Sequence, residues 1–270
     1  HNLNFEGEDR IDVINFIKEN RKNFSLGENL EFHLFEKANK LSLSFDEVAL
    51  GFNVYPINSL TYRAYPYLKS RLLHHKTEKF GYDPRRKELY VFNLTSSNKI
   101  IGFQVRALDN NGGPKYKTWN IERIYDRLKK PLNVNEEELD SLNKISMIFG
   151  ILTTDLSRQF TVFEGPIDSF FMSNTIGLTG VKKQILDFDD IPTVRYFFDN
   201  DIEGKSKMIQ KLKRGNAVFM WDKFLKDFRI PSKKVKDLND LVKYEYKHRT
   251  GCLNALDKYF TNNHLDIIFI

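Results

Sequence analysis

The chain of 270 residues contains a single cysteine, Cys252. This excludes a disulfide within the chain and any zinc site built from four cysteines or from two cysteines with two histidines. A lone cysteine usually serves packing rather than catalysis. We therefore interpret Cys252 as a small, partly buried apolar residue.

Long apolar runs are also missing, and none approaches the roughly 20 residues that a membrane-spanning helix needs. The first residues, His1 to Glu6, lack the basic and then apolar layout of a signal peptide. We therefore expect a cytoplasmic protein. The chain does not begin with Met, which leaves open a missing upstream domain.

The excess of positive charge is small, because 42 Lys and Arg residues stand against 36 Asp and Glu residues. The basic residues are nevertheless clustered, at 69–79, 85–87 and 115–130. Local positive fields of this kind attract polyphosphate chains. The alternative is that these clusters are ordinary solvated faces. With 23 Phe and 12 Tyr residues, the chain is not disordered.

The first half of the chain combines helices with one β-hairpin. The segments 88–94 and 99–107 are rich in β-formers and flank a turn at 95–98, which predicts the hairpin. The segment 56–66 is rich in Tyr and Pro and reads as irregular, and 109–114 reads as a loop. Helical patterns occur at 10–22, at 28–50 with Ser44 as an N-cap, at 121–128 and at 136–145.

The second half alternates short strands with helices. Strands are predicted at 160–163, 176–179, 194–198 and 217–221, and helices from Asp168 and over 202–213. This alternation is typical of a parallel sheet with helical crossovers. We therefore predict an α+β module followed by an α/β module, with a boundary near 150–158.

Acidic residues follow the predicted strands of the second module. Glu164 comes after the first of these strands, and Asp168 lies four residues further on. Asp199 and Asp201 follow the third strand, while Asp237 and Asp240 follow a short apolar stretch that we read as the end of another. Ligands bind beyond the carboxyl ends of parallel strands, so these carboxylates should converge. All-oxygen ligands suit Mg²⁺ or Mn²⁺. The alternative is that each acid is a separate cap or turn residue.

These motifs resemble the Toprim signature of bacterial-type primases, topoisomerases and some nucleases. The resemblance rests on FEGPIDS at 163–169, DND at 199–201 and KDLND at 236–240. In addition, IGFQVRAL at 101–108 and GPKY at 113–116 resemble two motifs of the primase catalytic core. The chain is most similar to the primases of T4-like tailed bacteriophages, over roughly residues 88–245. It departs from the family at Val105, where a Gly is frequent, and at Asn239, where cellular primases often have Asp.

The resemblance implies a Toprim-type parallel-sheet domain at 156–247, a basic α+β subdomain at 1–155 before it and a helical segment at 248–270 after it. It implies a DNA primase that makes short RNA primers. Its partners would be single-stranded DNA, ribonucleoside triphosphates and a hexameric replicative helicase, with a zinc-binding domain missing upstream. A Toprim nuclease and a non-catalytic replisome adaptor are the alternatives.

The resemblance also implies roles for individual residues. The metal ligands would be Glu164, Asp199, Asp201 and Asp237, with Asp168 a ligand or a supporting group, Glu164 a ligand or the catalytic base, and Asp240 left open. The phosphate-facing residues would be Arg106, Lys115 and Lys117. The catalytic residues would be Arg106 and Lys115 together with Glu164 and Asp168. Tyr116 would stack on a base, whereas Trp119 would either stack or pack in the core.

Overall fold

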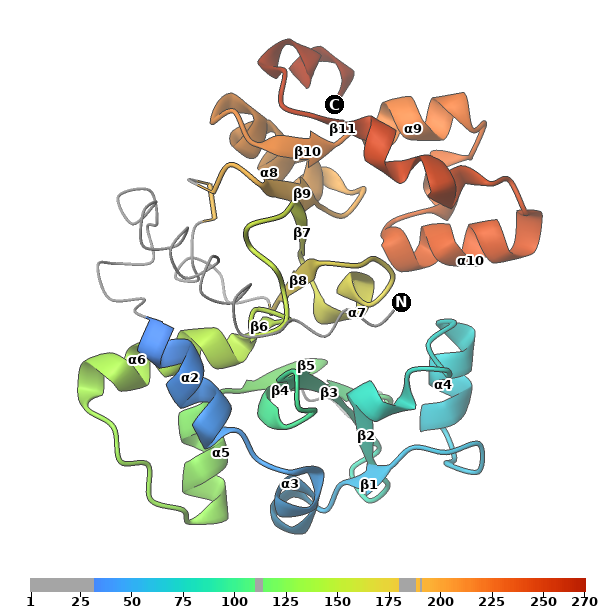
Figure 1. The fold of residues 1–270 in the computed structure, drawn as a ribbon. Helices are drawn as coiled ribbons and strands as arrows, with labels where there is room; N and C mark the ends of the chain where they lie inside the picture. Colours follow the sequence, from blue (N-terminus) through green and yellow to red (C-terminus); the bar gives the residue numbers. More distant parts are fainter. Residues whose placement is uncertain (1–31, 110–113, 180–187, 190) are drawn as a thin grey trace.

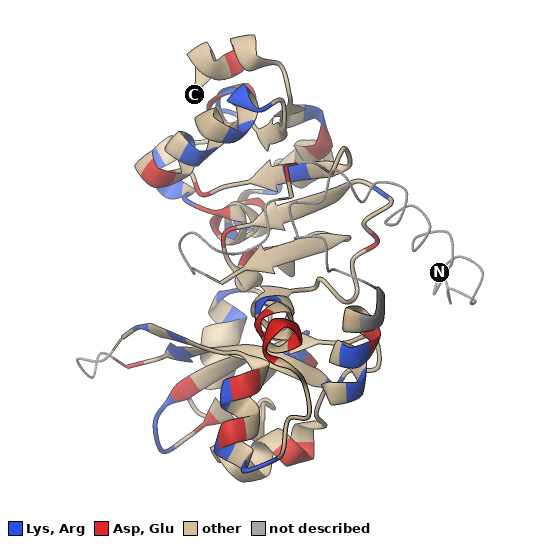
Figure 2. Ribbon diagram, turned by 90° about the vertical axis from the view of Figure 1, so that its left-hand side faces the viewer, with Lys and Arg blue, Asp and Glu red and all other residues tan. Residues whose placement is uncertain are grey.

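The computed structural model describes residues 32–109, 114–179, 188–189 and 191–270. It contains two β-sheets, one in each half of the chain, which lie one above the other in the view of Figure 2. The expected helix at 10–22 and part of the expected loop at 109–114 lie outside the described residues.

The first sheet is antiparallel throughout, with strand order β1-β2-β3-β4-β5. The predicted hairpin is confirmed, because β3 (Glu88–Leu94) pairs with β4 (Ile100–Ala107) across the expected turn. The other strands are β1 (Tyr55–Pro56), β2 (Phe80–Asp83) and β5 (Tyr116–Trp119).

Five α-helices and one 3₁₀-helix accompany this sheet among the described residues: α2 (Phe32–Leu41), α3 (Phe45–Phe52), α4 (Ala64–Ser70), η2 (Thr77–Lys79), α5 (Ile121–Leu128) and α6 (Glu136–Met147). The N-cap expected at Ser44 is present as a capping box with Glu47. Asn135 caps α6 in the same way with Glu138, so the acidic start of α6 is a charged first turn.

The segment 56–66 is not irregular throughout, because α4 begins within it at Ala64. Pro66 lies in the first turn of this helix. Backbone N–H groups of a first turn have no partner within the helix, so a proline is tolerated there.

The second sheet has the order β11-β10-β9-β7-β8-β6. Its four central strands are parallel, as predicted, and the two edge strands are antiparallel. The fold is therefore mixed α/β. The strands are β6 (Ile148–Phe149), β7 (Phe160–Phe163), β8 (Thr175–Leu178), β9 (Val194–Phe197), β10 (Ala217–Phe219) and β11 (Phe260–Thr261).

The elements that connect and follow these strands are α7 (Pro166–Ser169), α8 (Ile202–Lys213), α9 (Trp221–Asp227), η3 (Ser232–Lys234), α10 (Leu238–His248), η4 (Cys252–Tyr259) and η5 (His264–Phe269). The strand expected to run to Trp221 ends at Phe219, because Trp221 begins α9 and its indole donates a hydrogen bond to the Phe198 carbonyl at 2.8 Å. Helix α7 begins at Pro166, two residues before the expected start at Asp168.

The strand expected before Asp237 is not formed. Val235 ends the 3₁₀-helix η3, and Asp237 is the N-cap of α10. The short segment still runs beside the end of β9, because Asn200 donates hydrogen bonds from its amide to the Lys236 carbonyl at 2.6 Å and from its side chain to the Val235 carbonyl at 3.0 Å. These two bonds hold Asp237 at the sheet edge without a strand.

One large apolar core runs through both halves of the chain, and a second, smaller core joins them. Cys252 packs in the large core as expected, but it is fully rather than partly buried, and burial raises the pKa of its thiol to about 11. Gly102 is required where β4 meets α6, because a Cβ there would lie 2.1 Å from the Ser146 carbonyl oxygen. No helix of the described residues is long and apolar enough to span a bilayer.

Candidate active site

The site lies at the carboxyl ends of β7 and β9, which are parallel neighbours paired at Phe163 and Phe197. Glu164 follows β7 directly, and Asp199 follows β9 after one further residue. The amide of Asp199 donates a hydrogen bond to Glu164 Oε1 at 3.2 Å. The predicted convergence of these two acids is therefore observed.

Asp168 and Asp237 join this pair from two helices. The backbone amide of Asn239, in the first turn of α10, donates to Asp168 Oδ1 at 2.9 Å. Asp237 caps the same helix by accepting the amide of Asp240 at 2.7 Å. The starts of α7 and α10 therefore bring Asp168 and Asp237 together although the two residues are far apart in the sequence.

Burial and mutual repulsion raise the pKa values of three of these acids. Burial raises the pKa of Asp199 to about 7, with further contributions from the negative charges of Glu164 and Asp237. Burial and then the charge of Asp237 raise the pKa of Asp168 well above its ordinary value. Burial also raises the pKa of Asp237. The cluster thus holds more negative charge than its surroundings offset.

Asp201 differs from the other acids. It is the N-cap of α8 and accepts the Gly204 amide at 2.9 Å, a bond that lowers its pKa together with its contact to Lys236. Gly204 permits this close start of α8, because a Cβ there would lie 1.9 Å from the Asp199 carbonyl oxygen. Asp201 therefore stays ionised beside the more buried acids.

Two lysines supply counter-charge to the cluster. Lys207 contacts Glu164 and also lies 3.1 Å from Glu203. Lys236 Nζ lies 3.0 Å from Asp201 Oδ2 and 3.8 Å from Asp199 Oδ2. Across the described ranges, no three Asp, Glu, His or Cys side chains stand in an arrangement that would hold a metal ion as they are. The donor set is nonetheless all oxygen and electrostatically strained, which fits a hard divalent cation.

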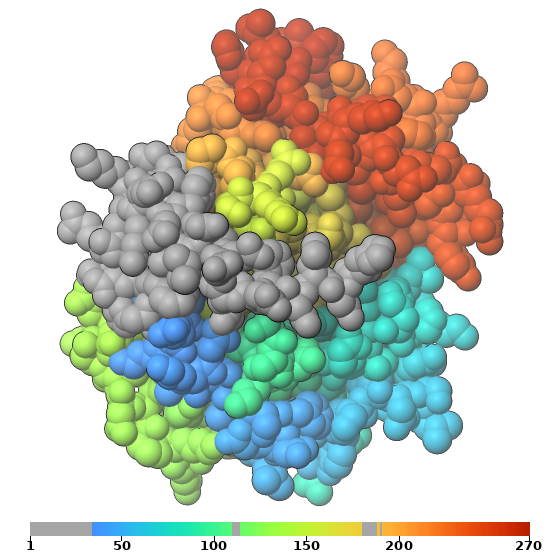
Figure 3. Space-filling model, in the orientation of Figure 1, coloured from blue at the N-terminus to red at the C-terminus, as the bar shows by residue number. Residues whose placement is uncertain are grey.

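Arg71 faces the acidic cluster from the first half of the chain. Its guanidinium donates to Asn239 Oδ1 at 2.8 Å, and the Asn239 side-chain amide donates back to the Arg71 carbonyl at 2.8 Å. Its positive charge partly opposes the rise in the pKa values of Asp168 and Asp237 that burial causes. Helix α4 ends just before Arg71, and the first turn of α10 contains Asn239. These two helices face each other across the two halves in Figure 1, and the two halves meet there in Figure 3.

From the sequence, Arg71 is only one member of the basic cluster at 69–79, and Asn239 is only a departure from the family motif, so neither is predicted to contact the other. The available signal was the spacing of Tyr67 and Arg71, which lie four residues apart and therefore share a helical face. The guanidinium lies 5.6 Å from the centre of the Tyr67 ring. The spacing therefore predicts that Tyr67 and Arg71 are neighbours, but it does not predict that Arg71 contacts Asn239.

Two of the three predicted phosphate-facing residues, Arg106 and Lys115, lie around Tyr116 in a second cluster that is separate from the acids. Arg106 lies 5.0 Å from the Tyr67 ring centre and 5.1 Å from that of Tyr116, to whose hydroxyl it donates a hydrogen bond. Lys115 is exposed and lies 5.7 Å from the Tyr116 ring centre. Tyr67 thus stands between Arg106 and Arg71, and so links the basic cluster to the acidic one.

The remaining candidates fall outside these two clusters or at their margin. Lys117 forms an ion pair of 2.9 Å with the buried Glu88. Trp119 packs on the core against Phe52 and Phe103. Core packing was one of the two roles expected for it. Asp240 forms an ion pair of 2.7 Å with Lys243. Part of the basic excess at 115–130 is surface charge that is already paired, because Lys130 forms an ion pair with Glu47 of α3.

No protein-family model matches the chain, and no curated protein matches it significantly. Solved structures with a similar arrangement include the RNA polymerase domain of Mycobacterium tuberculosis primase DnaG, with 16% identity and a TM-score of 0.43 over 94% of this chain and 84% of that chain. A DnaG primase catalytic domain bound to ssDNA has 14% identity and a TM-score of 0.39, covering 95% and 81%. At this level of similarity, the likeness assigns no role to any residue.

We predict that Asp199→Asn raises the melting temperature of the metal-free protein. The folded pKa of about 7 exceeds the ordinary value of 3.8, so the folded state retains a proton that the unfolded state releases. The stability of the parent protein should therefore fall as the pH rises from about 4 to about 7. Thermal melts across this range measure the effect, and each 1 kcal/mol corresponds to about 2–4 °C for a chain of this size.

Asp201→Asn is the matched control for this melt series. The pKa of Asp201 is lowered in the fold, so the loss of its charge removes favourable contacts rather than repulsion. We expect no stabilisation from this variant. Equal stabilisation by both variants would show that the acids do not repel each other as the geometry indicates.

We further predict that Asn239→Ala lowers the free energy of unfolding by about 1–3 kcal/mol, because the two Arg71 groups lose buried hydrogen-bond partners. Denaturant titration measures this loss. Asn216→Ala is the control, since Asn216 is also buried but its Nδ2 atom has no hydrogen-bond partner among the described residues. A loss no larger than that of Asn216→Ala would argue against the Arg71–Asn239 contact.

Proposed function

We propose that the chain is the catalytic core of a Toprim-type DNA primase that synthesises short RNA primers on single-stranded DNA. The observation that carries this proposal is the cluster of Glu164, Asp168, Asp199 and Asp237, in which burial and crowding raise the pKa values of the three aspartates. A site that concentrates uncompensated carboxylates at the ends of parallel strands is suited to metal-dependent chemistry on phosphates. The motif resemblance supports the same assignment.

The reaction joins the 3′-hydroxyl oxygen of one ribonucleotide to the α-phosphorus of the next ribonucleoside triphosphate. The bond from this phosphorus to the bridging oxygen breaks, pyrophosphate leaves and the hydroxyl proton passes to a base. Negative charge accumulates in the transition state, so positioning and electrostatic stabilisation provide most of the catalysis.

The residues that would hold Mg²⁺ or Mn²⁺ are Glu164, Asp199, Asp201 and Asp237, and the metal would lower the pKa of the attacking hydroxyl and neutralise the triphosphate. Asp168 is held by the Asn239 amide, which fixes it beside Asp237. Glu164 is contacted by Lys207 at the end of β7, and as an alternative to holding the metal it would accept the hydroxyl proton.

The basic cluster would bind phosphates. Arg106 presents a planar guanidinium that can contact two phosphate oxygens at once, whereas Lys115 supplies a point charge. Tyr116 is exposed beside Arg106, so its ring is available to stack on a base. Lys117 would contribute less, because it is already paired with Glu88.

Within this function, we propose more specifically that the chain is a primase of the T4-like bacteriophage type, on the basis of the motif resemblance. In that setting the protein would act in the host bacterial cytoplasm with a hexameric replicative helicase. A zinc-binding domain would select the start site, because phosphate contacts position a strand without reading its sequence.

We predict that Asp199→Asn and Asp201→Asn each reduce nucleotide joining by at least about a hundredfold, because each removes a charged oxygen that would hold the cation. The assay supplies single-stranded template, ribonucleotides and Mg²⁺ and measures new short RNA on gels. Shortened template instead of new RNA would identify a Toprim nuclease. Calorimetry without any Mg²⁺ or Mn²⁺ binding would identify a non-catalytic adaptor.

We predict that Arg106→Ala lowers template or nucleotide use by about 10- to 100-fold while metal binding persists, as expected for the loss of a charge-assisted phosphate contact. Lys115→Ala should have a weaker effect in the same direction. Calorimetric metal titration of each variant provides the control. Steady-state synthesis equal to that of the parent in both variants would show that these cations are ordinary surface charges.

A further inference from the structure

Lys236 places a positive charge between two of the proposed metal ligands. Its Nζ atom lies 3.0 Å from Asp201 Oδ2 and 3.8 Å from Asp199 Oδ2. One ammonium group thus contacts both acids of the motif at 199–201. A divalent cation bound by the same two oxygens cannot share their space with an ammonium group, because like charges repel strongly at such short distances. Lys236 would therefore have to leave these carboxylates for a metal ion to bind there.

The backbone of Lys236 is fixed beside the site, whereas its side chain reaches into solvent. Its carbonyl accepts the Asn200 amide at 2.6 Å, and its own amide donates to Asp240 Oδ2 at 3.4 Å. The side chain is 59% exposed, and lysine carries its charge on a long and flexible stem. The ammonium group can therefore change partners while the backbone that carries it stays in place.

Lys207, the second lysine of the cluster, also has a partner that is not a proposed ligand. It contacts Glu164 and lies 3.1 Å from Glu203, which precedes it by about one turn of α8. Lys207 can therefore pass wholly to Glu203 if Glu164 binds a metal ion. Lys236 has no comparable alternative, because its ion pairs within the described part of the chain involve proposed ligands only.

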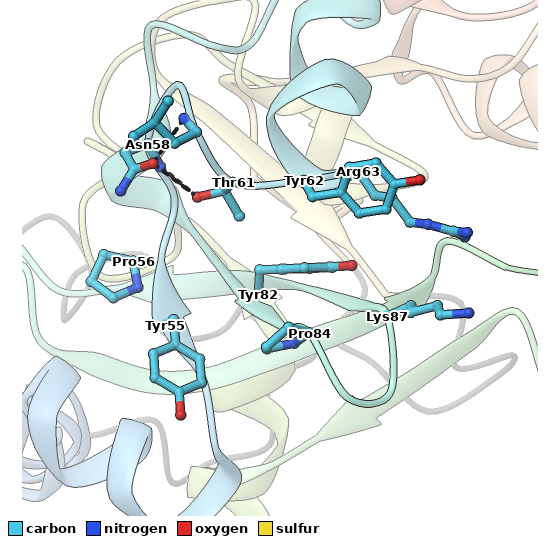
Figure 4. A pocket seen from close by; sticks show the side chains of 10 residues that line it. Tyr55, Pro56, Asn58, Thr61, Tyr62, Arg63, Tyr82, Pro84 and Lys87 are labelled. Carbon is cyan, nitrogen blue, oxygen red and sulfur yellow. Dashed lines mark hydrogen bonds between the residues drawn. The ribbon is translucent and has the colours of Figure 1, made fainter.

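Several cations elsewhere are paired with acids outside the site. An aromatic hollow of about 440 Å³ beside α4 is flanked by Arg63 and Lys87 (Figure 4), and both of these cations pair with Asp109. Near the start of α8, Lys205 Nζ lies 2.7 Å from Asp222 Oδ2. Metal binding at the acidic cluster would leave all of these pairs in place.

We propose that Lys236 is a displaceable counter-ion, which neutralises Asp199 and Asp201 until a metal ion binds and then contacts the phosphates of the incoming nucleotide. The second step rests on the proposed function, in which a metal ion at these carboxylates holds a triphosphate beside them. Lysine suits this exchange, because its compact ammonium group makes point contacts without a fixed geometry. The metal ion and the triphosphate would bind with positive cooperativity, because the triphosphate supplies the partner that the released lysine has lost.

The first test measures Mn²⁺ binding by isothermal titration calorimetry without nucleotide. Lys236→Met should bind Mn²⁺ about fivefold more tightly than the parent, because no partly exposed ion pair has to be broken first. Lys236→Arg should bind it no more tightly than the parent, since this variant keeps the charge. Because Lys236 is largely exposed, both variants should fold, which thermal melting verifies.

Lys205→Met is the matched control. It also removes a lysine that is paired with an aspartate, but Asp222 lies outside the site. The Lys205 amide donates to the Asp201 carbonyl at 2.9 Å, so the control residue starts from the same part of the chain as the motif. An effect of net charge alone would appear in this variant as well, whereas an exchange of contacts would not. We expect its Mn²⁺ affinity to equal that of the parent.

The second test measures the binding of inorganic tripolyphosphate at saturating Mn²⁺, again by calorimetry. Lys236→Met should bind tripolyphosphate about tenfold more weakly than the parent, as expected for the loss of one hydrogen bond to a charged group. Lys205→Met should bind it like the parent. The first variant therefore changes the two affinities in opposite directions. Unchanged tripolyphosphate binding by Lys236→Met would overturn the phosphate contact.

The two measurements together decide the proposal. Tighter Mn²⁺ binding with weaker tripolyphosphate binding in Lys236→Met, but not in Lys205→Met, supports it. Equal or weaker Mn²⁺ binding by Lys236→Met overturns it, as do equal shifts in both variants or a parent protein that binds no Mn²⁺. Neither test needs RNA synthesis, so a parent that gives the expected affinities but makes no RNA would contradict the proposed function alone.

Discussion

The repulsion among the buried carboxylates at the ends of β7 and β9 is the constraint around which the site is organised. Carboxylates this close cannot all remain ionised without a compensating charge. In the structure, part of that compensation comes from Lys207 and Lys236 and part from Arg71. The residual strain appears as the raised pKa values of Asp168 and Asp199. An added cation would relieve this repulsion.

Only some of this arrangement is readable from the sequence. Local sequence patterns predict four features correctly: the hairpin β3–β4, helices α5 and α8, and strand β7. In each of them the apolar residues recur with the period of a helix or a strand, and residues that end such an element follow. Glu164 and Asp199 were predictable for the same reason, since the end of a strand also fixes the position of the next residue. Local chemistry decides these features, so a local reading suffices.

The features that sequence reasoning missed depend on contacts between distant segments. Val235 resembles a strand end, but its segment is held by the backbone amide and the side chain of the single residue Asn200 rather than by a strand ladder. The edge strand β11 has two residues, too few for any pattern to predict. Asn239 is a buried polar residue whose partners, Arg71 and Asp168, come from two other parts of the chain. Sequence spacing carries no signal for partners of this kind.

The same contacts show why the first half of the chain belongs to the site. In α7, Ile167 packs into the small core formed by the first sheet and α4, while the next residue, Asp168, faces the acids. Lys76 donates to the Phe170 carbonyl at 2.6 Å, and the rings of Phe170 and Phe80 lie 5.5 Å apart. The first half therefore holds α7 at both ends. Because Asp168 cannot move independently of Ile167, the packing of the two halves sets the geometry of the acidic cluster.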